Sequence, residues 1–153
     1  MNVRACLCLL AALLAGCSAI EKMFEAKSKL RQVQVIAREG LNDDNATALD
    51  LVFAYNDAAV ALLPKTAPQW FGNKTALRAG LGTSLDVVEL QMVPTLEVLK
   101  APLPDRYRKA VAVFSYANYQ NADGQAQGQL TAYECVLVSM EPRAVLYDKC
   151  ILK

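Results

Sequence analysis

Apolar and polar residues alternate in most of the chain beyond residue 30. Alternation with a period of two is typical of half-buried β-strands. About seven segments carry strand signals, and polar or proline-containing turns separate them. They are 31–39, 48–56, 85–93, 95–100, 108–119, 130–140 and 144–152.

One stretch after the second predicted strand has helical spacing instead. Asp57 predicts the start of a short helical turn, and Thr66 predicts the start of a longer helix that ends at Gly80. Trp70 lies near the apolar face of this helix, which indicates a packing face over a sheet rather than a ligand platform. The pattern predicts a mostly β domain, either a small antiparallel β-sandwich or an open barrel, with one helical insertion.

The first 16 residues have the order of a signal peptide. Met1 to Arg4 carries one positive charge, Ala5 to Ala15 is apolar and uncharged, and two small residues precede Cys17. An apolar run of about eleven residues is too short for a transmembrane helix, which needs roughly 20. We therefore expect residues 1–16 to be removed.

The order Leu14-Ala15-Gly16-Cys17 resembles the lipobox of bacterial lipoproteins. This resemblance implies that Cys17 becomes the first mature residue and carries acyl chains such as palmitate. Ser18 follows the cysteine, which in enterobacterial lipoproteins implies the outer membrane, with the protein facing the periplasm. The alternatives are a secretory peptide with an incidental cysteine and a buried N-terminal helix. Residues 17–30 are expected to form a lipidated tether, either a mobile stalk or a short surface helix, before a domain spanning 31–153.

Charge and residue usage exclude several classes of function. The chain has 16 basic and 15 acidic side chains; because Arg4 leaves with the leader, the mature protein has 15 of each. A neutral domain without a basic cluster argues against nucleic acid as a partner. Histidine is absent, which removes the commonest general base and the commonest metal ligand. No phosphate loop or metal-binding spacing is present, so we expect neither an enzyme nor a cofactor or metal.

Carboxylates leave two weaker possibilities open. Asp50, Asp86 and Glu89 lie in predicted strands and could form a glycosidase pair, but we expect most of them on the solvent face. The run 42–45 is rich in Asp and Asn, yet it lacks the ligand spacing of a calcium loop. It is interpreted as a solvated turn.

Two cysteines remain outside the leader and the lipobox, Cys135 and Cys150. Cysteines of exported proteins more often form disulfides than act as nucleophiles. The segment Glu141-Pro142-Arg143-Ala144 predicts a turn between two strands. Counting outward from this turn places Cys135 opposite Cys150, so we predict a disulfide; two reduced, buried thiols are the alternative.

The succession of features suggests a family. A lipobox, a strand, GLNDDNATALDLVFAYN, a helical insertion, a strand with a proline bend, and KAVAVFSYANY follow one another. This order resembles the type VI secretion outer-membrane lipoprotein family. The resemblance implies a transthyretin-like β-sandwich and a membrane-anchored clamp, which binds the periplasmic domain of an inner-membrane secretion protein through the loop between the first two strands. By position, that loop consists of Leu41, Asn42, Asp43, Asp44 and Asn45.

The expected loop offers Leu41 as an apolar anchor and Asp43 and Asp44 as charges that steer a basic surface. An ordinary solvated hairpin loop is the simpler reading. Two other functions remain open at this stage. One is a lipoprotein that captures a small molecule or lipid between helix and sheet, and the other is an inhibitor of an envelope hydrolase.

Overall fold

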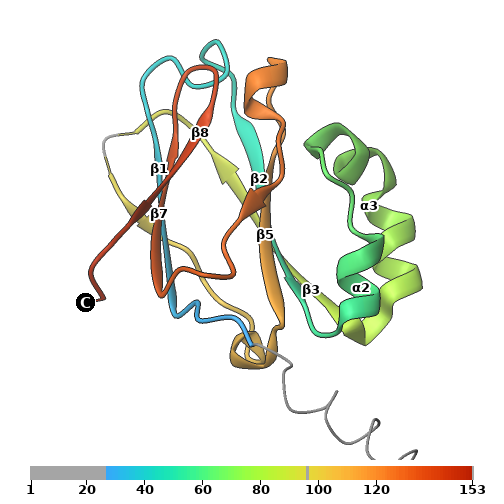
Figure 1. The fold of residues 1–153 in the computed structure, drawn as a ribbon. Coiled ribbons are helices and arrows are strands. Elements are labelled where there is room, and N and C mark those ends of the chain that lie inside the picture. The colour runs from blue at the N-terminus through green and yellow to red at the C-terminus, as the bar shows by residue number, and fades with distance from the viewer. Residues whose placement is uncertain (1–26, 96, 153) are drawn as a thin grey trace, which may run out of the picture.

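Two four-stranded sheets face each other in the computed structural model, which describes residues 27–95 and 97–152 (Figure 1). The first sheet has the order β4-β1-β7-β8, and the second has the order β3-β2-β5-β6. The strands of the first sheet are β1 (Gln32–Ala37), β4 (Leu99–Lys100), β7 (Cys135–Met140) and β8 (Val145–Lys149). Those of the second are β2 (Thr47–Ala54), β3 (Leu85–Met92), β5 (Ala112–Ala117) and β6 (Gly128–Gln129). The predicted mostly β sandwich is confirmed.

One strand pair departs from the antiparallel expectation. β1 and β7 pair in parallel, from Gln32 opposite Cys135 to Ala37 opposite Met140, while the other pairs within the sheets are antiparallel. Alternation sets which face a side chain occupies but not the direction in which a strand runs. The parallel pair could therefore not be predicted from the pattern.

The alternating residues of both sheets fill the space between them. Val35 of β1, Leu51 of β2 and Val138 of β7 are all fully buried in this core. Their neighbours along each strand point to the opposite face, as the pleat requires. In β1 and β2 the alternating positions read from the sequence, Val33, Val35 and Ala37 and Leu49, Leu51 and Phe53, are the ones that face this core.

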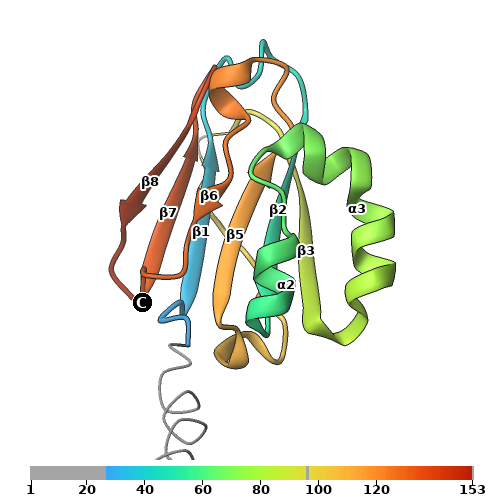
Figure 2. The same ribbon diagram turned by 45° about the vertical axis from the view of Figure 1, so that its right-hand side comes forward.

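The second sheet is covered on its other face as well. Two helices lie on it (Figure 2), α2 (Asp57–Leu62) and α3 (Ala67–Leu81). Trp70 of α3 is fully buried, and its ring stacks on that of Tyr116 with centroids 5.0 Å apart. The Tyr116 hydroxyl donates to the carbonyl oxygen of Pro64 at 2.7 Å, and burial raises its pKa to about 12. Trp70 is therefore a packing residue, as its position in the helix indicated.

The helix ends differ from the sequence prediction in two places. Asn56, rather than Asp57, caps α2, because its side-chain oxygen accepts a hydrogen bond from the Ala59 amide at 2.8 Å. α3 runs to Leu81 and is capped by Gly82, beyond the end predicted at Gly80. Gly82 has φ +49°, a conformation that glycine adopts at little cost.

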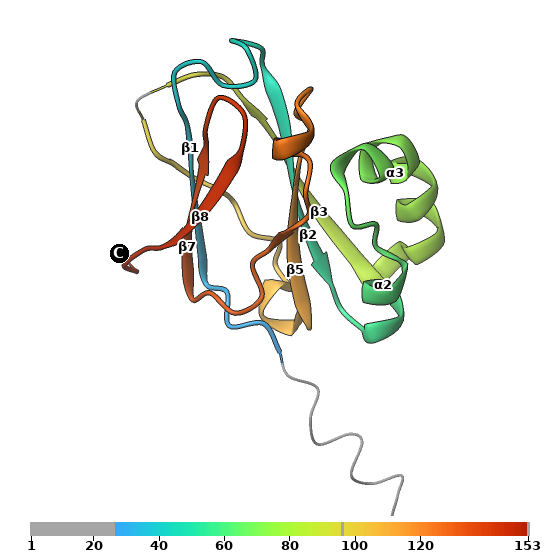
Figure 3. The same cartoon turned by 45° about the horizontal axis from the view of Figure 1, so that its top comes forward.

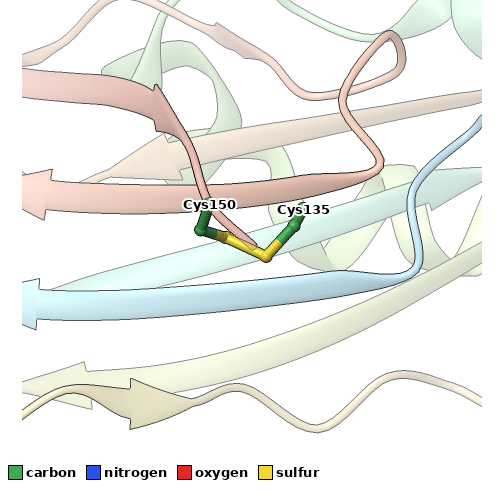
Figure 4. The surroundings of a disulfide bond; sticks show 2 residues. All are labelled: Cys135 and Cys150. Carbon is green, nitrogen blue, oxygen red and sulfur yellow. A yellow bond between two sulfur atoms is a disulfide. The ribbon is translucent and has the colours of Figure 1, made fainter. Parts of the chain in front are cut away.

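A disulfide joins Cys135 and Cys150 at the ends of β7 and β8 (Figure 4). Val136 pairs with Lys149, so the two cysteines occupy the next positions in the same register, with Cα atoms 5.0 Å apart. The turn closes through a hydrogen bond from the Glu141 amide to the Ala144 oxygen at 2.9 Å. The predicted pairing is confirmed.

We expect the double substitution Cys135→Ser and Cys150→Ser to lower the free energy of unfolding by about 2 kcal/mol. The bridge spans 15 residues, and closing a loop of this size is worth at most about 3 kcal/mol when the loop is flexible in the unfolded chain. The midpoint of urea unfolding measures the loss. Reductant should shift the midpoint of the wild-type protein and leave that of the variant unchanged; equal midpoints without reductant would contradict the prediction.

The domain begins slightly before the predicted boundary at residue 31. The Ser28 amide donates to the Ala110 oxygen at 2.8 Å, the Lys29 amide donates to the Thr131 oxygen at 3.1 Å, and Leu30 is buried. The predicted leader, 1–16, and Cys17 lie outside the described residues. In the part of the chain that is described, no helix has the length and apolarity needed to cross a membrane.

Candidate functional site

Three segments meet at the end of the sandwich where β1 and β7 finish, and we call this region the loop end (Figures 1 and 3). They are 38–46, 120–124 and 141–144. The main-chain amide of Asn42 donates to the Pro142 carbonyl oxygen at 3.0 Å. The side-chain oxygen of Asn42 accepts from the main-chain amide of Gln120 at 2.8 Å. The loop proposed from the sequence is thus hydrogen-bonded to segments 120–124 and 141–144.

Asn42 holds this loop from within. Its side chain is buried, and the side-chain amide nitrogen donates to the Thr47 hydroxyl at 3.0 Å. The Asn45 side chain donates to the main-chain oxygens of Asn42 and Asp43, both at 3.0 Å. Hydrogen bonds therefore hold the turn on both sides.

The backbone of this turn is left-handed at three successive residues, with φ +48° at Asn42, +56° at Asp43 and +59° at Asp44. A left-handed residue other than glycine costs roughly 1–2 kcal/mol, and Asn and Asp tolerate the conformation best. The surrounding hydrogen bonds must offset this cost for the turn to persist. The result is a rigid turn that presents Asp43 and Asp44 to solvent.

Leu41 does not have the role expected of it. Its side chain is fully buried between the two sheets, so it offers no apolar anchor to a partner. The left-handed turn begins at the next residue and carries the chain outward only after Leu41. Of the five predicted loop residues, Asp43, Asp44 and Asn45 are exposed.

The loop end is acidic. It has a net charge of −3. The two basic side chains are Arg38 and Arg143, and the five acidic ones are Glu39, Asp43, Asp44, Asp123 and Glu141. Arg38 lies 3.7 Å from Glu141. Neither Asp43 nor Asp44 has a salt-bridge partner within the described residues. Their charges are therefore available to a basic surface.

Solved structures of other proteins share this architecture and show which known fold it is. The T6SS lipoprotein TssJ1 from Pseudomonas aeruginosa superposes with a TM-score of 0.57 at 14% identity, over 80% of this chain and 96% of that one. The chain has the fold of the type VI secretion lipoproteins. Lip of Serratia marcescens, a membrane-bound component of the Type VI Secretion System, superposes with a TM-score of 0.51 at 14% identity, over 77% and 96%. A chain of a type VI membrane complex gives 0.50 at 13%, over 78% and 96%.

The resemblance inferred from the sequence is thus confirmed at the level of the fold. Comparison with protein-family models and with curated proteins gives no match. The TssJ-like fold places the loop between β1 and β2 at one end of the sandwich, where the geometry described above makes it rigid and acidic.

Tyr119 also positions the loop end of this TssJ-like fold, and the sequence analysis missed it. Its hydroxyl donates to the Glu141 oxygen at 2.6 Å, and Gly124 lies so close to its ring that an added Cβ would approach within 2.4 Å. Burial raises the pKa of the Tyr119 hydroxyl well above its ordinary value. Strand alternation identified Tyr119 only as part of a strand, and no local signal marks its contact with the hairpin.

A polar network joins α3 to the second sheet of the TssJ-like fold. Asp50, which we expected on the solvent face, is only 1% exposed. It accepts a hydrogen bond from the Trp70 indole at 2.8 Å and lies 2.8 Å from the Lys74 ammonium, which also lies 2.9 Å from Glu89. Burial lowers the pKa of Lys74, but the hydrogen bonds to Asp50 and Glu89 outweigh it and leave the pKa raised. These carboxylates hold the helix in place.

The third carboxylate considered for catalysis, Asp86, is engaged as well. It accepts a hydrogen bond from the Tyr55 hydroxyl at 2.6 Å and lies 3.0 Å from Arg106. It lines an open cleft of about 690 Å³ between β3 and the segment 103–106. Among the described residues, no group of three or more acidic or cysteine side chains could hold a metal ion.

Proposed function

We propose that the protein is a structural, non-enzymatic component of a type VI secretion apparatus, anchored in the outer membrane through acylated Cys17 and facing the periplasm. The TssJ-like fold supports this proposal, since two solved structures with that fold are described as type VI lipoproteins or membrane-bound components. The observation that carries it is the rigid acidic turn at Asp43 and Asp44.

The partner is the periplasmic domain of an inner-membrane secretion protein. Asp43, Asp44 and Asn45 form the contact, because they are the exposed members of a turn whose backbone is already fixed. A pre-ordered turn loses little conformational entropy on binding. The two carboxylates accelerate association with a basic surface and align the partner.

The lipoprotein works by holding its partner, without chemistry. The helix–sheet interface, where a ligand-binding lipoprotein would hold its ligand, is filled by the stacked rings of Trp70 and Tyr116. This packing favours a protein-binding function over capture of a small molecule at that interface.

We expect the double substitution Asp43→Lys and Asp44→Lys to weaken partner binding at least tenfold, because like charges then face each other and slow association. Both side chains are exposed, and Asn42, which supports the turn, is unchanged. Pull-down of envelope complexes with the tagged protein identifies the partner, and binding kinetics at two salt concentrations measure the change. Asp148→Lys on β8 is the control for added positive charge away from the turn.

Lysine tolerates the left-handed backbone less well than aspartate, so Asp43→Asn with Asp44→Asn, which removes both charges and suits the conformation, is the second turn variant. Urea unfolding must give similar midpoints for the wild type and this variant, which separates lost binding from lost structure. Recovery of no inner-membrane secretion component would contradict the proposed function. Equal recovery with wild type and variant would discard Asp43 and Asp44 as the site. Capture of an envelope hydrolase instead would favour the inhibitor alternative.

A further inference from the structure

The first described residues, 27–31, precede β1 and carry three basic side chains. Lys27, Lys29 and Arg31 are exposed, whereas Ser28 is half-buried and Leu30 is buried. Three positive side chains are therefore exposed on the segment by which the chain enters the domain.

A second basic segment lies beside the first. The 3₁₀ turn η3 (Tyr107–Lys109) and the residue before it contribute Arg106, Arg108 and Lys109. The hydrogen bond from the Ser28 amide to Ala110 holds the two segments together. Figure 1 shows η3 at the end of the sandwich where the chain enters the domain.

We call this region the tether end and define it as residues 27–31, 104–110 and 131–134. It carries six basic and two acidic side chains, a net charge of +4. Arg106 is paired with Asp86 of β3, which leaves +3. The loop end, with its net charge of −3, lies at the far ends of β1 and β7.

The charges of the tether end and of the loop end are screened from each other. Six residues of β1 span about 20 Å, whereas the screening length at physiological salt is about 8 Å. An approximately neutral chain has thus been divided into one positive and one negative end. No basic cluster is visible along the sequence because the six basic residues come from two segments about 75 positions apart.

We propose that the tether end is a docking surface for the anionic lipid headgroups of the membrane that holds the anchor. This inference rests on the lipid anchor of the proposed function. Nine residues separate Cys17 from Lys27, so even a fully extended connection of ten steps reaches only about 36 Å. The tether therefore keeps the basic side chains within about 36 Å of the headgroups, which raises their effective concentration at the bilayer. Electrostatic attraction draws the tether end to the bilayer, and repulsion turns the acidic loop end toward the periplasm.

The test uses the mature chain, residues 17–153, carrying Cys17→Ser, so that neither acyl chains nor the apolar leader contributes to binding. Flotation compares vesicles of phosphatidylcholine alone with vesicles that also contain phosphatidylglycerol. We expect at least tenfold stronger binding to the anionic vesicles, and we expect high salt to abolish the difference. Equal binding to both vesicle types would overturn the inference.

Charge reversal locates the surface. Each basic residue near an anionic bilayer strengthens binding about fivefold, so Arg108→Glu with Lys109→Glu should weaken binding about 25-fold or more. The matched control is Arg38→Glu with Arg143→Glu, which makes the same charge change at the loop end. Equal loss in both variants would show that net charge rather than a surface determines binding, and would overturn the inference.

Two further outcomes separate the membrane surface from a site for free anions and from a failure of the anchor. Displacement by inorganic phosphate at matched ionic strength would indicate a site for free anions and overturn the membrane surface. If Cys17→Ser leaves the protein in the membrane fraction, the proposed anchor fails, whereas release of this variant without preference for anionic vesicles overturns only the docking surface.

Discussion

Trp70→Ala is expected to lower the free energy of unfolding by about 4 kcal/mol. Trp70 is fully buried between α3 and the second sheet, and it stacks on Tyr116. Alanine would leave a cavity there and would remove the indole hydrogen bond to the buried Asp50 carboxylate. Since domains of this size are stable by only about 5–15 kcal/mol, the loss is a large fraction of the total. Urea unfolding followed by circular dichroism measures it.

Two companion variants separate the causes. Trp70→Phe keeps an aromatic ring but leaves Asp50 without the indole donor, and we expect a smaller loss of about 1–3 kcal/mol. Phe71→Ala, at a half-buried neighbour on the same helix, should cost less than Trp70→Ala. If Trp70→Ala cost no more than Phe71→Ala, the helix would not depend on the tryptophan.

Cys17→Ser, expressed behind a cleavable secretory signal peptide in place of residues 1–16, is expected to release the protein from the membrane fraction as a soluble, folded periplasmic protein. Each buried methylene of an acyl chain contributes about 0.8 kcal/mol, so loss of several chains removes the stable anchor. The charged tether end alone gives weak and salt-sensitive attraction. Membrane fractionation in high salt is the measurement, with Cys135→Ser as the cysteine control. Unchanged sedimentation of the Cys17→Ser variant would contradict lipid anchoring.

Much of the fold could be predicted because its signals are local. Alternation at Val33, Val35 and Ala37 identifies a core face, and the proline turn between Cys135 and Cys150 sets a register that can be counted. Such signals depend on residues close together in the sequence, and the local structure that they predict is present in the folded protein. The parallel pairing of β1 with β7 depends on residues about 100 positions apart and leaves no local trace.

The candidate site was predicted only in outline. Leu41 belongs to the same polar loop as Asp43, yet the left-handed turn decides that one is buried and the other exposed. Asp50 looked like a solvent-face residue because its strand alternates cleanly. It is buried because α3 covers that face, and its burial becomes possible once Trp70 and Lys74 supply hydrogen bonds.

The parallel pairing of β1 and β7 also determines when the protein can fold. Gln32 meets Cys135, so the first strand of the domain has no β7 partner until nearly all of the chain has been synthesised. Pairing over such a separation is slow, because a long loop must close before its contacts form. β1 therefore stays without this partner until β7 has been synthesised. If the chain is exported as proposed above, this delay would leave time for passage through the membrane before the first sheet forms.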